Sequence, residues 1–147
     1  MIAIGIDPGA KGALSVNHNG TVHVIPFNKE SYRLALYFAH ANAADEKIVC
    51  CIEKVHAMPK QGSVSMFTFG ENYGYLKGCL DCLEIPYQEI PPQTWKKEFG
   101  LNSDKTKAIE VCKQLFPDVN LIPLGCRKEQ DGMAEAVLMA EYARRKL

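Results

Sequence analysis

The sequence predicts an α/β fold in which a central, mixed five-stranded sheet is flanked by helices. The first part of the chain contains three short β-type runs, and two of them flank Asn19-Gly20, a strong two-residue hairpin signal. From residue 29 onward, segments with helical spacing alternate with apolar β-type runs, which is typical of strands joined by helices. The sheet is therefore expected to begin with three antiparallel strands and to continue with parallel ones.

The strands are assigned from short apolar runs. The segment over 47–52 is continuously apolar after Lys47, which predicts a strand buried on both faces. Pro91 and Pro92 end the last run. In chain order the expected strands are 2–7, 12–16, 21–25, 47–52 and 86–90.

The helices are assigned from spacing and from their end signals. Ser103 is the expected N-cap of one helix, and Pro117 lies beyond its end. Loops are expected over 55–62 and 118–127. The expected helices are 29–43, 63–83, 105–116 and 131–146, with a short helical turn over 93–97.

The long helix over 63–83 carries glycines at a spacing of four: Gly70, Gly74 and Gly78. Each glycine lowers helix stability by up to about 1 kcal/mol, so the stripe indicates that another backbone approaches closely. The sheet beneath is the favoured neighbour, and a partner helix in a homodimer is the alternative.

Composition describes an ordinary globular chain and one domain over 1–147. The 147 residues are 47% hydrophobic and 23% charged, and 17 basic residues balance 17 acidic ones. No run is long and apolar enough for a membrane span, and no secretory signal is visible. The six cysteines are read as reduced core residues of a cytoplasmic protein, and the lone CxxC at Cys79 and Cys82 lacks the second ligand pair of a zinc site.

Four carboxylates stand at positions where isolated charge is unfavourable. Asp7 and Glu53 each end a strand, and Asp131 and Glu135 share one face of the last helix. Buried carboxylates need a partner charge or a metal ion. Without clustered His or Cys, such a group favours Mg²⁺ or Mn²⁺, and two ions would activate water for phosphodiester hydrolysis.

Each acid also has a simpler explanation. Asp7 in Asp-Pro-Gly fits an ordinary turn, and Asp131 fits an N-cap. Glu135 is a possible salt-bridge partner of Lys128. Glu53 has no turn signal beside it, and the four acids together are more specific than any one alone.

The acidic motifs resemble those of RuvC-type Holliday-junction resolvases, which have the ribonuclease H-like fold, and especially the short phage forms. The resemblance spans nearly the whole chain. The residues that carry it are GIDPG at 5–9, IEKV at 52–55, the loop with Met58-Pro59-Lys60, PPQTWKK at 91–97 and DGMAEAVLMAEYA at 131–143.

This resemblance implies that Asp7, Glu53, Asp131 and Glu135 form a catalytic site for two Mg²⁺ ions, with Mn²⁺ as a substitute. It also implies a homodimer, formed through the helix at 63–83, that binds branched DNA and makes paired nicks in four-way junctions. Family members commonly carry two Asp residues three apart in the last helix, whereas Asp131 and Glu135 are four apart. Glu135 aligns with the last family acid, and Asp131 is offset by one residue.

The expected DNA contacts are basic and aromatic residues. Lysines contact phosphate without reading sequence, and an aromatic ring can stack on unpaired bases at a junction centre. Solvated lysines and core phenylalanines are the ordinary alternatives. The candidates are Lys60, Lys96, Lys97, Lys105, Lys107, Phe67 and Phe69.

Other function classes compete with the junction nuclease. A ribonuclease H-like nuclease of the ribosomal-RNA-processing type also begins with a strand and an early Asp-x-Gly. The loop and glycine-bearing helix after Glu53 favour the resolvase. An ATP-binding module of the actin type needs two such domains, for which 147 residues are too few. A non-catalytic nucleic-acid-binding module would have to keep several inward-facing acids without a metal.

Overall fold

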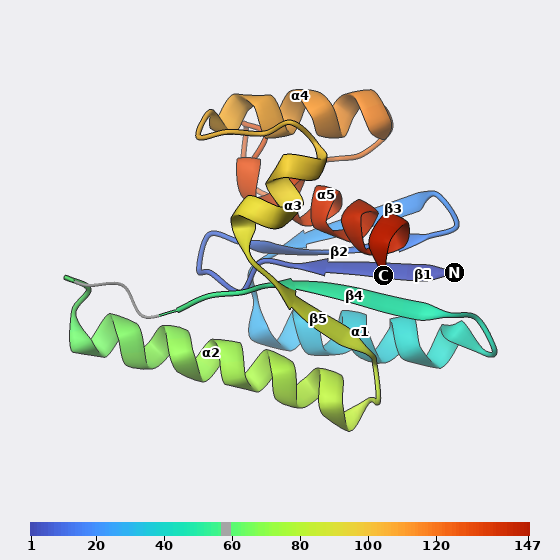
Figure 1. The fold of residues 1–147 in the computed structure, drawn as a ribbon, viewed down its shortest axis with the longest axis horizontal. Coiled ribbons are helices and arrows are strands. Elements are labelled where there is room, and N and C mark those ends of the chain that lie inside the picture. The colour runs from blue at the N-terminus through green and yellow to red at the C-terminus, as the bar shows by residue number, and fades with distance from the viewer. Residues whose placement is uncertain (57–59) are drawn as a thin grey trace.

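The computed structural model describes residues 1–56 and 60–147 as a five-stranded sheet covered by helices on both faces (Figure 1). The sheet order is β3-β2-β1-β4-β5; β2 pairs antiparallel with β1 and β3, and β4 pairs parallel with β1 and β5. The predicted fold class is confirmed. The strands are β1 (Ile2–Ile6), β2 (Ala13–His18), β3 (Thr21–Pro26), β4 (Ile48–Glu53) and β5 (Tyr87–Ile90).

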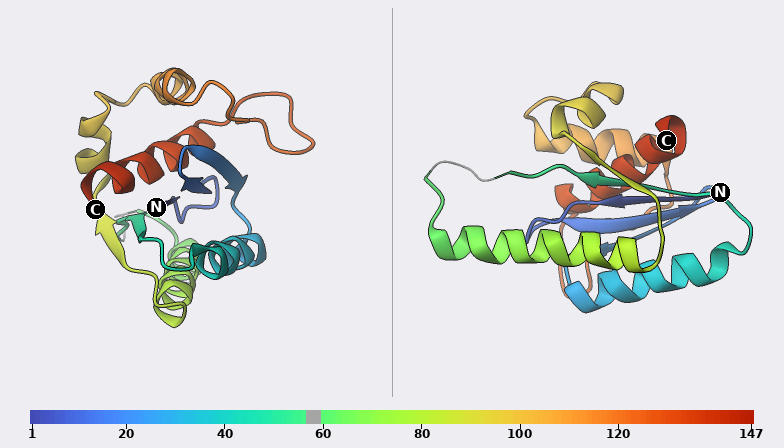
Figure 2. Two further views of the ribbon diagram at one scale, coloured as in Figure 1. Left: turned by 90° about the vertical axis from the view of Figure 1, so that its right-hand side faces the viewer. Right: turned by 60° about the horizontal axis from the view of Figure 1, so that its bottom comes forward.

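The helices form layers on the two sides of the sheet. One face is covered by α1 and α2, and the other by α5, with α3 and α4 stacked outside it (Figures 1 and 2). Two separate apolar cores result, one on each face. The helices are α1 (Lys29–Ala43), α2 (Ser63–Cys82), α3 (Pro92–Glu98), α4 (Lys105–Leu115) and α5 (Asp131–Lys146).

Small residues let α5 cross β1 at close range. Alternation along β1 turns Ile4 and Ile6 toward α1 and α2 and turns Ala3 and Gly5 toward α5. A Cβ on Gly5 would lie 2.3 Å from the carbonyl oxygen of Ala136 in α5. The helix backbone therefore rests almost directly on the strand backbone, and it fixes where the side chains of α5 project.

Two details at helix ends differ from expectation. The N-cap of α4 is Asp104 instead of Ser103, because the carboxylate of Asp104 accepts a hydrogen bond from the Thr106 backbone N–H at 3.0 Å. The short helix α3 begins at Pro92, one residue earlier than predicted. Proline suits the first turn of a helix because the N–H that it lacks has no intrahelical partner there.

The expectation that the sheet lies against the glycine stripe of α2 is wrong. A Cβ on Gly70, Gly74 or Gly78 would meet no atom within 4 Å in the described part of the chain. The stripe faces away from the sheet, and α2 buries only Leu76 and Leu80.

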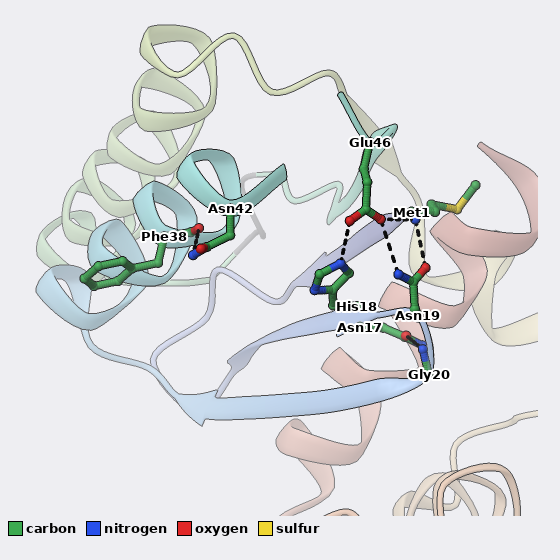
Figure 3. Close-up of polar contacts among 8 residues, drawn as sticks. All are labelled: Met1, Asn17, His18, Asn19, Gly20, Phe38, Asn42 and Glu46. Atoms are coloured by element: carbon green, nitrogen blue, oxygen red, sulfur yellow. Dashed lines mark hydrogen bonds and ion pairs between the residues drawn. The ribbon is translucent and has the colours of Figure 1, made fainter. Parts of the chain in front are cut away.

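The end of the sheet at the start of β1 is held by a polar cluster (Figure 3). The carboxylate of Glu46 binds the α-amino group of Met1 and lies 2.8 Å from Nε2 of His18. Asn19 in the β2–β3 turn also donates to Glu46. These contacts pull the Glu46 pKa down to about 2, chiefly through the Met1 and His18 hydrogen bonds. The cluster ties the hairpin to the segment before β4.

The cysteines are all free, but they are not all core residues. Cys50, Cys51 and Cys112 are buried, whereas Cys82 and Cys126 are exposed. Cys82 ends α2, and Cys126 lies in the loop before α5, so neither segment turns its thiol toward a core. Within residues 1–56 and 60–147, no helix combines the length and apolarity needed to cross a bilayer.

Candidate active site

Asp7 and Glu53 lie side by side at the carboxyl ends of two neighbouring parallel strands. The ladder between β1 and β4 pairs Ile6 with Ile52, so the next residue on each strand is level with the other. Alternation places both carboxylates on the sheet face that carries α5. The register of the sheet thus produces the predicted juxtaposition.

Helix α5 adds Asp131 and Glu135. Asp131 is the first residue of the helix, and Glu135 follows one turn later on the same face. Gly132 lets this end of the helix seat on the turn after Asp7, because a Cβ there would lie 2.3 Å from the Lys11 carbonyl oxygen.

Two of the acids have neutral hydrogen-bond donors. Oδ1 of Asp7 accepts from the Gly9 backbone N–H at 2.9 Å, which is the predicted turn chemistry. Oε2 of Glu53 accepts from the indole Nε1–H of Trp95 at 2.9 Å, and Trp95 is fully buried. Asp7 therefore forms the predicted turn contact and also lies beside Glu53.

Glu135 forms an ion pair with Lys96, with 3.1 Å between Nζ and Oε1. The suggested pairing with Lys128 is wrong, because α3 lies beside α5 and places Lys96 over its second turn, while Lys128 is exposed in the preceding loop. The N-cap of α5 is Gln130, so Asp131 does not cap the helix.

The acids are electrostatically coupled. Burial raises the pKa of Glu53 to about 7, and the charges of Asp7 and Glu135 add to the shift against the opposing Trp95 hydrogen bond. Burial also raises the pKa of Asp7 and of Glu135, and Lys96 opposes the shift in both. A cation bound among these carboxylates would offset both the cost of burying their negative charges and the repulsion between them.

A cavity of about 250 Å³ opens beside this group. It is lined by three of the predicted acids, Asp7, Asp131 and Glu135, and by two of the predicted lysines, Lys96 and Lys105. Glu53 lies next to Asp7 on the sheet but does not line the cavity.

Sequence reasoning missed several lining residues, among them Lys11, Asn102 and Ser103. Lys11 stands four residues after Asp7, within the turn between β1 and β2, so its proximity to the acid was available from the sequence. Asn102 and Ser103 reach the cavity only through the packing of the α3–α4 connection, which has no local sequence signal.

The other predicted DNA contacts lie outside this cavity. Lys97 and Lys60 are exposed, and Lys107 is half-buried. Phe67 in α2 is 74% exposed, whereas Phe69 is half-buried, 3.9 Å from where a Cβ of Gly9 would lie. Met58 and Pro59 of the predicted loop motif lie outside the described residues.

The acids offer oxygen ligands, which fit a hard divalent cation. In the described ranges, however, no three Asp, Glu, His or Cys side chains are close enough together to hold one ion as they stand. Two of the four acids already have partners: Lys96 pairs with Glu135, and Trp95 donates a hydrogen bond to Glu53. The ion pair with Lys96 uses Oε1 of Glu135.

The sheet order and the helices on both faces are those of a ribonuclease H-like fold. Two of the similar solved structures are of RuvC, the Holliday-junction resolvase, from Thermus thermophilus. Its complex with a Holliday-junction substrate matches with a TM-score of 0.65 and 15% identity, over 99% of this chain and 96% of that one. A second Thermus thermophilus RuvC structure gives a TM-score of 0.61 and 14% identity, with the same coverage.

Comparisons with protein-family models and with curated protein sequences gave no match. The predicted resemblance to RuvC-type resolvases is confirmed by the structural comparison as a likeness of fold.

Proposed function

We propose that this chain is a divalent-metal-dependent endonuclease that resolves four-way DNA junctions by paired nicks. The observation that carries the proposal is the level position of Asp7 and Glu53 on adjacent strands, facing Asp131 and Glu135 of α5. The fold likeness to a resolvase in complex with a Holliday junction supports the choice of branched DNA as substrate.

The four acids are the proposed ligands of Mg²⁺ or Mn²⁺. Bound ions would supply an activated water and would stabilise the leaving oxygen of the phosphodiester. The Gly9 N–H orients Asp7 through Oδ1, and the Trp95 indole holds Glu53. Lys96 neutralises Glu135 while no cation is present, and it can turn to a phosphate afterwards.

Basic residues around the cavity are the proposed phosphate contacts nearest the acids. Lys11, Lys96 and Lys105 line it on three different segments. Lys60, Lys97 and Lys107 extend this positive surface. Phe67, exposed on α2, is proposed to stack on a base at the junction centre, and Phe69 to support it.

A second copy of this chain is the proposed neighbour of the glycine stripe on α2. Two active sites are needed for paired nicks, and Gly70, Gly74 and Gly78 leave the helix backbone open to close approach. The exposed Val64 on the same helix adds apolar surface. The enzyme is placed in the cytoplasm, where its free thiols would remain reduced.

The activity is tested with end-labelled four-way, three-way and linear DNA substrates and a structured RNA, each with Mg²⁺ or with EDTA. Symmetric nicks in the four-way junction with Mg²⁺, and none with EDTA, are expected. Asp7→Asn is the inactive control. Cleavage of the RNA alone would move the function to the RNA-processing class, and junction binding without any cleavage would make the chain a binding module.

The dimer is tested by measuring the molar mass of the protein with light scattering as it elutes from a size-exclusion column. Gly74→Leu is expected to shift the native dimer to a monomer, because a large side chain separates the two helices. Thr68→Leu, at an exposed position of α2 on another side of the helix, is the matched control. A monomeric native protein, or a Gly74→Leu protein that remains dimeric, would contradict this interface.

A further inference from the structure

We propose that Trp95 is a positioning residue that fixes the carboxylate of Glu53 for cation binding through its indole N–H. This inference rests on the proposed function, because it assigns Glu53 to the cation site. It adds a specific task for the only tryptophan of the chain.

The contact is direct and buried. Nε1 of Trp95 lies 2.9 Å from Oε2 of Glu53, although the residues are 42 positions apart in the chain. Trp95 has no exposed surface. A buried indole N–H without an acceptor is unfavourable, so donor and acceptor hold each other in place.

The donor is carried by a rigidly attached helix. The strand β5 ends at Ile90, and α3 starts at Pro92, so there is almost no loop to absorb motion. The indole ring packs in the core between α5 and the sheet, together with Val49 and Cys51 of β4. The strand that carries Glu53 and the ring that binds it therefore belong to the same core.

The contact leaves one carboxylate oxygen available. Trp95 engages Oε2, and Oε1 accepts no hydrogen bond from the described residues. Hydrogen bonds of this kind orient metal-ligating carboxylates, and their removal typically lowers metal affinity or activity roughly 10- to 100-fold. The next residue, Lys96, reaches Glu135, so consecutive positions of α3 contact two acids.

A purely structural role would need only the volume of the ring. The two roles separate if the N–H is removed while the shape is kept. Because the chain has one tryptophan, growth of a tryptophan auxotroph on benzothienylalanine replaces that N–H alone with sulfur. Trp95→Phe is the genetic counterpart. Phe99→Leu is the matched control, since Phe99 packs against the same core and its side chain has no hydrogen-bond donor.

Mn²⁺ binding is measured without DNA by electron paramagnetic resonance. The benzothienylalanine protein is expected to bind Mn²⁺ roughly 10- to 100-fold more weakly than the tryptophan protein while it keeps its fold. The single indole N–H resonance of the ¹⁵N-labelled native protein is expected to shift when Mg²⁺ is added. In cleavage assays, kcat is expected to fall while junction affinity in Ca²⁺ stays the same.

Equal Mn²⁺ affinity of the native and benzothienylalanine proteins would overturn the positioning role. So would an equal loss in Phe99→Leu, because it would trace the effect to packing. If the native protein neither bound Mn²⁺ nor cut DNA, the proposed function itself would fail. Cleavage that tolerates removal of the N–H would reject only the role of Trp95.

Discussion

Asp7 and Glu53 follow residues that pair directly across the β1–β4 ladder, so two carboxylates leave the sheet side by side on one face. Burial raises the pKa of both, and the charge of Asp7 raises that of Glu53 further. The arrangement is unfavourable for the isolated protein and favourable for a protein that binds a cation. The first prediction follows from this contrast.

Asp7→Asn is expected to abolish junction cleavage and yet to stabilise the metal-free protein. Cleavage is expected to fall at least about a thousandfold, since several kcal/mol of charge stabilisation depend on the site. The free energy of unfolding in EDTA is expected to be about 0.5–2 kcal/mol higher for the variant than for the unmodified protein, because one buried charge is gone. This gain in stability should disappear in Mg²⁺, because the ion is expected to bind and stabilise the unmodified protein but not the variant. A variant that cuts normally, or that is less stable in EDTA, would show that Asp7 does not belong to such a site.

Gly5→Val is expected to destabilise the protein and to displace α5. The added Cβ would lie 2.3 Å from backbone atoms of the helix, and overpacking of this kind costs about 1–3 kcal/mol. Urea unfolding measures the change. Gly62→Ala is the control, because Gly62 has negative φ and a Cβ there would meet nothing within 4 Å in the described part of the chain. Equal midpoints for the two variants would contradict the close crossing.

Lys105→Ala combined with Lys107→Ala is expected to weaken junction binding and to flatten its salt dependence. Removing one phosphate interaction reduces the slope of log K against log salt by about 0.9. Binding is measured in Ca²⁺ between about 50 and about 200 mM salt, the range in which the effect is large. Lys113→Ala, in the last turn of the same helix and paired with Glu129, should leave the slope unchanged. An unaltered slope in the double variant would remove both lysines from the phosphate-binding surface.

Glu141 is expected to make the protein acid-sensitive. Burial alone would raise its pKa, but hydrogen bonds and charges from Arg144 and Arg145 outweigh it and hold the pKa below the usual value of 4.5. A lowered pKa means that the contribution to stability is complete above pH 4.5 and is lost as pH falls through the native value.

Glu141→Gln should therefore lower the free energy of unfolding by about 1–2 kcal/mol at neutral pH and reduce its decline between neutral and acid pH. Denaturant unfolding at several pH values measures both effects. A constant difference between the two proteins at all pH values would mean that the ion pair does not contribute.

The sheet and the acids could be predicted because their signals are local. Asn19-Gly20 identifies the hairpin, and the apolar runs locate the strands, although β2 continues past its run through Asn17 and His18. Asp7 and Glu53 stand out because each is a charged residue directly after such a run. Once the two strands are neighbours, alternation puts the acids together without further information.

The interactions that complete the site have no local signal. Trp95 is 42 residues from Glu53, and only the packing of α3 brings the two together. The pairing of Lys96 with Glu135 likewise depends on how two helices cross. The sheet is the wrong neighbour for the glycine stripe of α2 for the same reason. The spacing shows that one face of the helix lacks side chains, but it does not show what packs against that face.

The close packing of α5 against Gly5 links changes in the core to changes in the position of the acidic group. Asp131 and Glu135 belong to α5, whose backbone at Ala136 lies against Gly5 of β1. A bulkier residue in this contact, here called the α5–β1 seam, is therefore expected to move the acids as well. Substitutions that repack this core cannot be neutral for the site unless a second change restores the helix position. We therefore expect residues of the seam to vary in correlated pairs among relatives, while the outer faces of α1 and α4 vary freely.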